Sequence, residues 1–578
     1  MTIRQLLEEH LSAALQAAGA PAGTPALVGL ATRPEFGDYQ ANGVMAVAKR
    51  LKTNPRQLAE QVIEELDLQD LVEKVEIAGP GFINITLASE LLTAHLSKAL
   101  ADERLGVEGA EPVQKIVVDY SAPNLAKEMH VGHLRTTVIG DTLVRVLEFL
   151  GHDVTRHNHV GDWGTQFGML IAYMDRLEAE GGATLAAELG DLEKFYQAAK
   201  QLFDEDSEFA DLARQNVVKL QGGDEHCLRR WQHFIDESLR HCQQVYERLG
   251  VTLSAADVRG ESAYNDELPK VVEALREKGL LTESQGAQCV FLDQFKNKEG
   301  DILPVIVQKS DGGYLYTTSD LAALRYRAQV LRADRILYVV DARQELHLQQ
   351  VFATARAAEF APVQTSIEHH SFGMVKGEDG KPFRTRQGGT VKLMELLQEA
   401  EQRAFDLVGE KSPDLPEAER RQVARAVGIG SVKYADLSLN RTTDYIFSWD
   451  TMLALNGNTA PYLQYSYTRV QSIFRRGELD GAALDAPLLI VEPAERALAV
   501  KLAQFAEAVE IVARDCYPNL LCNYLYELAE TFMKFYESCP VLKADEPTRT
   551  SRLLLCQLTA RTMQTGLGLL GLETIERM

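Results

Sequence analysis

The segment from Lys115 to Leu150 constrains the fold most, because it predicts a strand, a loop and a helix in that order. The β-branched residues at positions 116–118 are typical of a buried strand in a parallel sheet. Pro123 then interrupts the run with turn chemistry. Apolar residues recur at helical spacing up to Leu150, and Gly151 ends the predicted helix. We therefore expect a doubly wound parallel sheet whose ligand lies at the carboxyl end of this strand.

The predicted loop brings His130, Gly132 and His133 to the start of the helix, with Lys127 just before them. Two histidines three residues apart share one helix face, and Gly132 lets a flat ring approach the backbone. Imidazoles donate hydrogen bonds to phosphate oxygens, and the lysine adds a fixed positive charge. The pattern predicts a site for the triphosphate of ATP. Taken alone, it also fits a plain surface helix start or a zinc-binding histidine pair.

Composition and charge exclude several classes of protein. The 578 residues are enough for three or four domains with cores of their own. A formal charge of −23 argues against a general polyanion binder, although it allows a local basic groove. The seven cysteines form no CxxC pair, so we expect neither a structural zinc site nor a disulfide framework. Without a signal-peptide core or an apolar run of membrane-spanning length, the chain is expected to be cytoplasmic, with no membrane contact.

The stretch PNLAKEMHVGHLRTT resembles the HIGH signature of class I aminoacyl-tRNA synthetases, in the form typical of arginyl-tRNA synthetases. The stretches GDWGTQFG, YLYTTSD and LGLETIERM extend the resemblance to the bacterial enzymes over nearly the whole chain. It implies ATP-dependent ligation of L-arginine to tRNA(Arg) through an arginyl-adenylate, with Mg²⁺ bound through the nucleotide and no structural metal. It also implies a monomer, in which His130, His133 and Lys127 are catalytic and Gly132 helps to bind ATP.

Tyr316 and Asp320 are the candidate arginine contacts, because one helical turn after the Asp311-Gly312 turn signal presents both to one ligand. A carboxylate selects a guanidinium by bidentate pairing and rejects neutral amino acids. Asp320 could instead cap the helix N-terminus. The resemblance favours the arginine site, and it adds further contacts at Asp119, Asn124 and Gln344.

The second class I signature, KMSKS, has no clean copy in this chain. The nearest stretch places Lys381, Arg384 and Arg386 among glycines, a composition that suits either an ATP phosphate-binding loop or a solvated hairpin. In the family that the chain resembles, a lysine at the position of Lys127 compensates for a degenerate KMSKS.

Three domains are expected. Residues 1–110 predict a small α+β domain that the resemblance assigns to the D-loop of tRNA. Residues 111–400 predict a Rossmann-like catalytic domain with a helical insertion at about 172–295, after which the sheet resumes near Cys289 with strands at 305–307 and 336–340. Residues 401–578 predict an all-α domain, which the resemblance identifies as anticodon-binding.

Aromatic, amide and basic side chains in the two terminal domains are the candidate tRNA contacts. Such side chains stack unpaired bases and hold phosphates. The candidates of this kind are Phe82, Asn84, Tyr462, Tyr465 and Arg469, and the resemblance of LGLETIERM adds the C-terminal Met578. Phe82 and Asn84 could equally be ordinary sheet residues, and the tyrosines could lie in a helical core.

Two other functions stay open. A nucleotidylyltransferase of the same superfold would have no need of the large helical C-terminal part. A non-catalytic tRNA-binding paralogue of a synthetase would have no use for an intact HVGH, YTTSD and Lys127.

Overall fold

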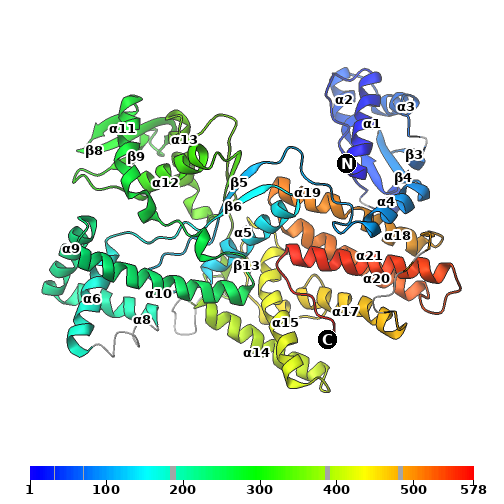
Figure 1. Ribbon diagram of the computed structural model, residues 1–578. Helices are drawn as coiled ribbons and strands as arrows, with labels where there is room; N and C mark the ends of the chain where they lie inside the picture. The colour runs from blue at the N-terminus through cyan, green and yellow to red at the C-terminus, as the bar shows by residue number, and fades with distance from the viewer. Residues whose placement is uncertain are drawn as a thin grey trace. The chain divides into compact units, whose positions relative to one another are not determined.

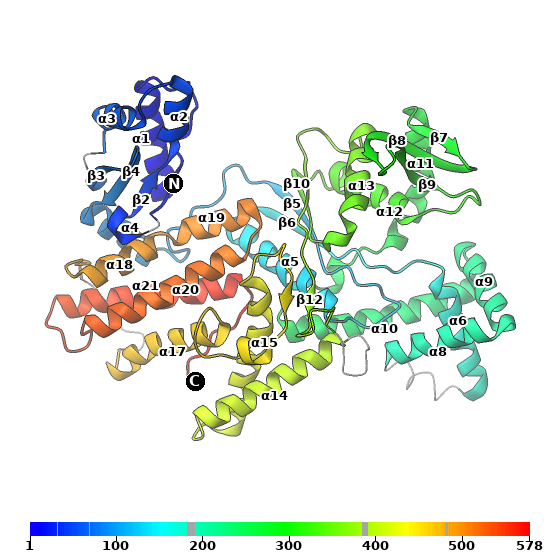
Figure 2. The ribbon, with the colours of Figure 1, turned by 180° about the vertical axis from the view of Figure 1, so that it is seen from behind.

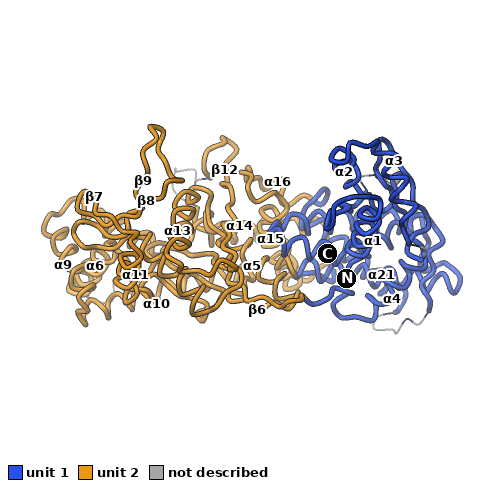
Figure 3. The backbone as a smooth tube through the Cα atoms, turned by 90° about the horizontal axis from the view of Figure 1, so that it is seen from above, with its two compact units in different colours: residues 1–109, 455–568, 573–578 blue, residues 110–454, 569–572 orange. Residues whose placement is uncertain are grey.

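The computed structural model describes residues 1–31, 33–68, 70–181, 191–383, 391–479, 484 and 486–577 (Figure 1). The chain divides into two compact units, which Figure 3 shows in different colours. Unit 1 comprises residues 1–109, 455–568 and 573–578, and unit 2 comprises residues 110–454 and 569–572. Among the described residues, no helix is both long enough and apolar enough to cross a membrane.

The N-terminal part of unit 1 is an antiparallel sheet of order β1-β2-β4-β3 with helices packed against it. Its elements are α1 (Ile3–Ala17), β1 (Val28–Leu30), β2 (Tyr39–Ala41), α2 (Gly43–Leu51), α3 (Pro55–Glu64), β3 (Val72–Ala78), β4 (Phe82–Leu87) and α4 (Ser89–Ala101). Local sequence sets the helix starts. Thr2 caps α1 by accepting a hydrogen bond from the Gln5 backbone N–H, and Asn54 caps α3 just before Pro55 at its first position.

The C-terminal part of unit 1 is entirely helical in its described residues. Its helices are α17 (Ala460–Arg476), α18 (Pro493–Ala503), α19 (Phe505–Asp515), α20 (Asn519–Ser538) and α21 (Thr548–Leu569). Two contacts join these helices to the start of β2: Arg496 donates to the partly buried Asp38 at 2.8 and 2.9 Å, and the buried Tyr39 donates to Glu507 at 2.7 Å. The two ends of the sequence therefore fold into one unit.

The core of unit 2 is a parallel sheet of order β11-β10-β5-β6, whose inner strands lie side by side in Figure 2. Its strands are β5 (Lys115–Asp119), β6 (Asp153–His157), β10 (Arg335–Tyr338) and β11 (Ser366–His369). Residues 116–119 of β5 are all buried, as expected of a strand with both faces covered. The predicted doubly wound core is confirmed, and α5 (Gly132–Phe149) follows β5 as the signature predicts.

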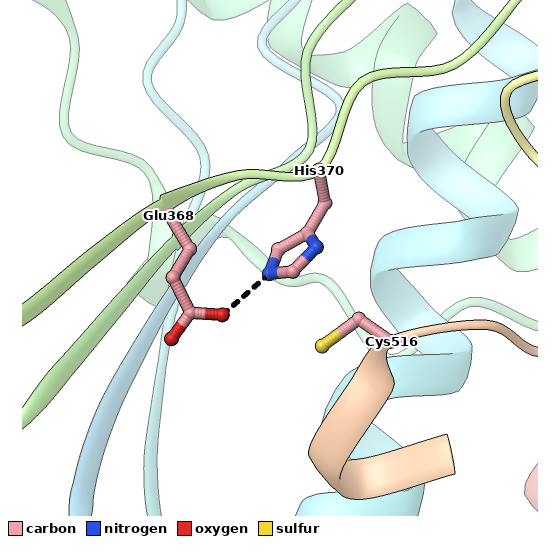
Figure 4. A group of neighbouring side chains, drawn as sticks. All are labelled: Glu368, His370 and Cys516. Carbon is pink, nitrogen blue, oxygen red and sulfur yellow. Dashed lines mark hydrogen bonds and ion pairs between the residues drawn. The ribbon is translucent and has the colours of Figure 1, made fainter. Parts of the chain in front are cut away.

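A salt-bridge network fixes the edge strand of this sheet. Arg335 of β10 donates to both carboxylate oxygens of Glu368 on β11, at 2.6 and 2.8 Å. His370 Nε2 lies 2.8 Å from the same carboxylate (Figure 4). The paired Arg335 and His370 hold the pKa of Glu368 well below its usual range, although burial alone would raise it. The carboxylate is therefore ionised and shared by two neighbours.

The prediction that the sheet resumes near Cys289 was wrong. β7 (Leu281–Ser284), β8 (Ala287–Lys296) and β9 (Ile302–Gln308) form a separate antiparallel sheet of order β7-β8-β9. In β9, Val305 and Val307 are buried while Ile306 is 40% exposed. This alternation marks a strand with one covered face, whereas a strand in the parallel core is covered on both. The strand predicted at 336–340 does join the parallel sheet, as β10.

The inserted segment is mainly helical, as predicted, but it ends in strands β7 and β8. Its helices are α6 (Gln166–Gly181), α8 (Leu192–Glu205), α9 (Ser207–Gln221), α10 (Glu225–Leu249) and α11 (Leu268–Glu277). After β9 the chain forms α12 (Tyr316–Arg325), which precedes β10, and α13 (Glu345–Ala357), which connects β10 to β11.

The predicted start of the helical C-terminal domain at residue 401 falls inside α14 (Leu393–Lys411). This helix and α15 (Glu417–Leu437) belong to unit 2, together with the short elements β12 (Val375–Lys376), β13 (Tyr445–Ile446) and α16 (Trp449–Met452). Buried polar contacts explain the difference. Asp436 of α15 pairs with Arg135 of α5 at 3.1 Å, and Lys433 donates to the Leu249 carbonyl at 2.8 Å.

Candidate functional site

The turn between β5 and α5 is sharply bent and held by hydrogen bonds on both sides. Ser121 and Ala122 have positive φ values of 68° and 44°. The Ser121 N–H donates to the Thr136 hydroxyl at 3.0 Å, and the Ala122 N–H donates to Asn158 Oδ1 at 3.0 Å. These contacts from α5 and from the end of β6 stabilise the strained turn. The conformation of the loop is therefore determined by its tertiary contacts and not by local backbone preference.

The two signature histidines form one rigid pair. The Gly132 N–H donates to His130 Nδ1 at 3.0 Å, and the His130 N–H donates to His133 Nδ1 at 3.1 Å. Their ring centroids are 4.0 Å apart. Since each Nδ1 accepts a backbone hydrogen bond, a neutral ring carries its proton on Nε2. The pair therefore offers two N–H donors in fixed positions.

Both histidines are neutral at physiological pH. Burial, followed by the nearby His130 ring, lowers the pKa of His133 to about 3. Burial also lowers the pKa of His130, with a further contribution from Lys127. A Cβ on Gly132 would lie 2.7 Å from Cε1 of the His130 ring, so only glycine fits between the rings and the turn. The exposed Lys127 adds a positive charge to this region.

A segment far along the chain braces the signature turn. His130 forms an antiparallel bridge with Lys392, and the Val131 N–H donates to the Val391 carbonyl at 3.0 Å. The Lys392 ammonium lies 2.8 Å from Asp191 Oδ1 and 3.2 Å from Glu128 Oε2. No motif in residues 391–393 predicts this role, so Lys392 could not be identified as a site residue from the sequence.

Asp320 lies one turn inside α12, so the alternative that it caps this helix is wrong; the N-cap position belongs to Leu315. Its carboxylate pairs with His347 Nε2 at 2.6 Å. This contact raises the pKa of His347. Tyr316 precedes it by one turn with 64% of its surface exposed. The predicted pair thus shares one helix, with the acid recessed and the tyrosine open to solvent.

Glu261 is an acid near Asp320 that sequence reasoning missed. Burial, then the charges of Asp320 and Asp162, raise the pKa of Glu261 to about 8. It lies in η3 (Glu261–Glu267), between α10 and α11 of the inserted segment, where no motif marks it. Because Asp320 and Glu261 repel each other in a partly buried place, this place favours the binding of a cation.

The other predicted arginine contacts lie along the carboxyl edge of the sheet. Asp119, at the end of β5, is buried and pairs with Arg327 at 2.9 Å. Asn124 is exposed, and its Oδ1 accepts a hydrogen bond from the Ala126 N–H at 3.0 Å. Gln344 is exposed at the end of η5 (Ala342–Gln344), which follows β10. The roles of Asp119, Asn124 and Gln344 in binding arginine stay predictions.

Of the predicted second phosphate loop, the structure describes only Lys381; Arg384 and Arg386 lie outside the described residues. Lys381 is exposed beside a tight turn in which the Gly377 N–H donates to its carbonyl at 2.8 Å. The neighbouring Lys376 is paired with Asp444 at 2.7 Å.

The candidate tRNA contacts of unit 1 fall into two groups. In the sheet, Phe82 is partly buried, while Asn84 is 7% exposed and accepts a hydrogen bond from Gln40 Nε2 at 2.7 Å. On α17, Tyr465 is 38% exposed and accepts a hydrogen bond from Arg469 Nη1 at 2.7 Å. Tyr462, on the same helix, packs on Tyr526 of α20; Met578 lies outside the described residues.

Comparisons with known proteins cover the whole chain. Residues 95–449 match the family model "tRNA synthetases class I (R), catalytic domain", residues 463–578 match "DALR anticodon binding domain", and residues 5–87 match "Arginyl tRNA synthetase N terminal domain". Over 578 residues and all of both chains, the sequence is 61% identical to the arginine–tRNA ligase of Hahella chejuensis and 61% identical to that of Laribacter hongkongensis.

Solved structures give the same result. The arginyl-tRNA synthetase of Plasmodium falciparum matches with a TM-score of 0.87 and 30% identity, covering 100% of both chains. That of Thermus thermophilus matches with a TM-score of 0.84 and 26% identity, again over 100% of both. The chain therefore belongs to the arginyl-tRNA synthetase family of class I aminoacyl-tRNA synthetases, with all three of the family's domains present.

Proposed function

We propose that this chain ligates L-arginine to tRNA(Arg) in two steps. In the first, an arginine carboxylate oxygen attacks the α-phosphorus of ATP, and the bond to the bridging oxygen breaks to release pyrophosphate. In the second, a hydroxyl of the terminal tRNA ribose attacks the carbonyl carbon of arginyl-adenylate, losing its proton as AMP leaves. Catalysis consists of positioning and charge stabilisation, so no side chain has to become covalently bound.

The observation that carries the proposal is the fixed pair of neutral histidines next to a lysine. The Nε2–H groups of His130 and His133 donate to phosphate oxygens, and Lys127 balances the charge that develops on the departing pyrophosphate. Because the donors are held before ATP arrives, little reorganisation is needed during the reaction. Gly132 leaves room for the His130 ring, which a Cβ at this position would meet at 2.7 Å.

Class I synthetases use ATP, and we propose that its Mg²⁺ is bound through the nucleotide. The carboxylates beside the signature turn, Glu128 and Asp191, are both paired with Lys392. They make a poor ready-formed Mg²⁺ site, since the ion prefers unpaired carboxylates together with substrate phosphates. Lys381, Arg384 and Arg386 are proposed to contact the same phosphates. We propose no protein-bound structural metal.

We propose that arginine binds between Asp320 and Glu261, with Tyr316 at the opening and Asn124 and Gln344 at the carboxyl edge of the sheet. The guanidinium neutralises two acids that otherwise repel each other, as the raised pKa of Glu261 indicates. Asp320 is already paired with His347, so a neutral amino acid would chiefly leave Glu261 without a cationic partner, which disfavours such a ligand. We also propose that Asp119 meets the α-amino group or the guanidinium end of arginine; in the free protein its carboxylate is paired with Arg327.

We propose that tRNA is held by Phe82 and Asn84 of the N-terminal sheet and by Tyr462, Tyr465, Arg469 and Met578 of the C-terminal part. The exposed Tyr465 and its partner Arg469 suit stacking and phosphate contact. Residues 1–110 are proposed to bind the D-loop, residues 111–454 to catalyse, and residues 455–578 to bind the anticodon, since α14 and α15 belong to unit 2. The family's relatives in bacteria support a cytoplasmic enzyme, and we propose that it works as a monomer.

The testing experiment is ATP–pyrophosphate exchange with each amino acid in turn, with and without total tRNA. We expect exchange with arginine and with no other amino acid. Exchange that appears only with tRNA would show that activation depends on tRNA, and exchange without tRNA would show that it does not. No exchange in either condition, with tRNA still bound, would identify a non-catalytic tRNA-binding protein.

A further inference from the structure

The side chain of Lys127 rests on an aromatic ring that no motif includes. Its ammonium lies 4.4 Å from the centroid of the Tyr196 ring, on α8 of the inserted segment. Among the described residues, no carboxylate lies within ion-pair distance of this ammonium. A lysine has a long, flexible stem, so its position is defined only where a partner restricts it. Here that partner is the face of a tyrosine, which attracts cations through its π-electrons.

The helix that presents this ring is tied to the signature turn. Asp191 caps α8 by accepting a hydrogen bond from the Lys194 N–H at 3.1 Å, and the Lys392 ammonium lies 2.8 Å from the same oxygen, Oδ1. The ammonium is also 3.2 Å from Glu128 Oε2, in the residue next to Lys127, and the Lys392 backbone pairs with His130. The first turn of α8 is thus fixed to the segment that carries both histidines and Lys127.

Packing holds the rest of α8 in place. Phe195, the residue before Tyr196, is fully buried, and its ring lies 5.7 Å from Phe234 of α10 and 4.9 Å from Tyr173 of α6. With its start clamped by Lys392 and its inner face packed in this cluster, α8 has little freedom to rotate. The Tyr196 ring is therefore a rigid support.

We propose that Tyr196 is a positioning residue that holds the Lys127 ammonium where pyrophosphate departs, and that Lys392 sets the helix carrying this ring. The inference rests on the proposed role of Lys127 in the reaction. It assigns to the inserted segment a part in ATP activation that acts entirely through Lys127, without contact between Tyr196 and the substrate.

The test compares Tyr196→Leu, which removes the ring, with the matched control Tyr196→Phe, which keeps it. We expect the leucine variant to lower kcat/KM for ATP in pyrophosphate exchange by about two- to fivefold, the worth of a partly exposed cation–π contact. The phenylalanine variant should stay near the wild-type value. Thermal unfolding of both variants shows whether they fold, and Tyr196→Gln replaces the leucine variant should that one fail to fold.

The same substitution in a variant that lacks the Lys127 ammonium distinguishes positioning of that ammonium from a general structural effect. In Lys127→Met, replacing Tyr196 by leucine should cause no further loss, because the group that it positions is gone. An equal loss in both backgrounds would overturn the inference while leaving the role of Lys127 intact. If Lys127→Met itself exchanges at the wild-type rate, the role of Lys127 and this inference both fail.

Lys392→Met tests the clamp with the same readout. It leaves Glu128 and Asp191 facing each other without the shared cation, so we expect a loss of exchange that is smaller in the Lys127→Met background than in the wild type. A loss that is unchanged in that background would remove Lys392 from the inference.

Discussion

At the scale of single residues, the surroundings keep two histidines and one glutamate of the candidate site neutral. The histidines are held neutral by burial and by backbone hydrogen bonds to Nδ1, so each acts as a fixed N–H donor. With its pKa raised to about 8, Glu261 is mostly protonated at physiological pH, and a bound cation would favour its ionised form. In both cases the surroundings, rather than the residue type, decide the protonation state.

His133→Ala should reduce pyrophosphate exchange by about 10²–10³-fold, the typical loss on removing one transition-state donor. The fold should survive, because the histidine makes its backbone contact within its own turn. Steady-state exchange and thermal unfolding measure the two effects. The control is His233→Ala, an exposed histidine on α10. A His133→Ala variant with near-normal turnover would remove the catalytic role.

Arginine binding should weaken as the pH falls below about 8. The pKa of Glu261 is raised to about 8 in the free protein, and a bound guanidinium favours the ionised form. Binding below this pH therefore releases a proton, at a cost of up to about tenfold in affinity per pH unit. The same raised pKa means that the stability contributed by protonated Glu261 is lost as the pH rises from the ordinary carboxyl range through 8.

Calorimetric titration with arginine in buffers of different ionisation enthalpy measures this proton release. Glu261→Gln should abolish it and flatten the pH dependence of arginine affinity, whereas the exposed control Glu277→Gln should not. Proton release that persists in Glu261→Gln would assign the titrating group elsewhere.

At the scale of elements, a buried ion pair fastens the signature helix to α15. Arg135 and Asp436 lie 3.1 Å apart with side chains 1% and 0% exposed, and Arg135 Nη1 also donates to the Thr443 carbonyl at 3.0 Å. The pair comes from residues three hundred positions apart in the chain. It explains why α15 belongs with the catalytic unit rather than with the C-terminal helices.

Arg135→Met should destabilise the protein by about 3–5 kcal/mol, because it leaves the Asp436 carboxyl buried without its partner. Urea unfolding followed by circular dichroism of the whole chain measures the change. The double variant Arg135→Met with Asp436→Leu should recover part of the loss, since no unpaired charge is left. A single variant as stable as the wild type would show that the pair contributes nothing net.

At the scale of the whole molecule, a chain of net charge −23 has to bind a polyanion. Such a chain gains little from general attraction to RNA, so its tRNA contacts must be local. Arg469, beside the exposed Tyr465, is one such contact in the proposed function. Its guanidinium also lies 5.4 Å from the ring of Tyr536, which limits its freedom.

Arg469→Ala should raise the KM for tRNA in aminoacylation and reduce the slope of log KM against log salt concentration by about one. The turnover at saturating tRNA should stay unchanged, since the residue belongs to unit 1 and the catalytic residues belong to unit 2. Arg549→Ala on α21 is the control. An unchanged salt slope would exclude a phosphate contact at Arg469.

The sequence by itself was enough to predict the β5–α5 segment, the histidine pair and the shared helix of Tyr316 and Asp320. These features depend on neighbouring residues: apolar periodicity, turn chemistry and a motif whose parts lie within one or two helical turns. The activity was predicted from the family resemblance, which is specific because its motifs occur along nearly the whole chain.

Only the tertiary structure decided which distant residues complete the site. Glu261, Lys392 and Tyr196 carry no local signal, and they meet the motif residues through the packing of the inserted helices and of the extended residues just before α14. The same holds for β9, whose residues predict a strand but not its sheet. Side-chain pattern reports how a segment is buried, while strand pairing and ion pairing depend on partners that the local sequence does not name.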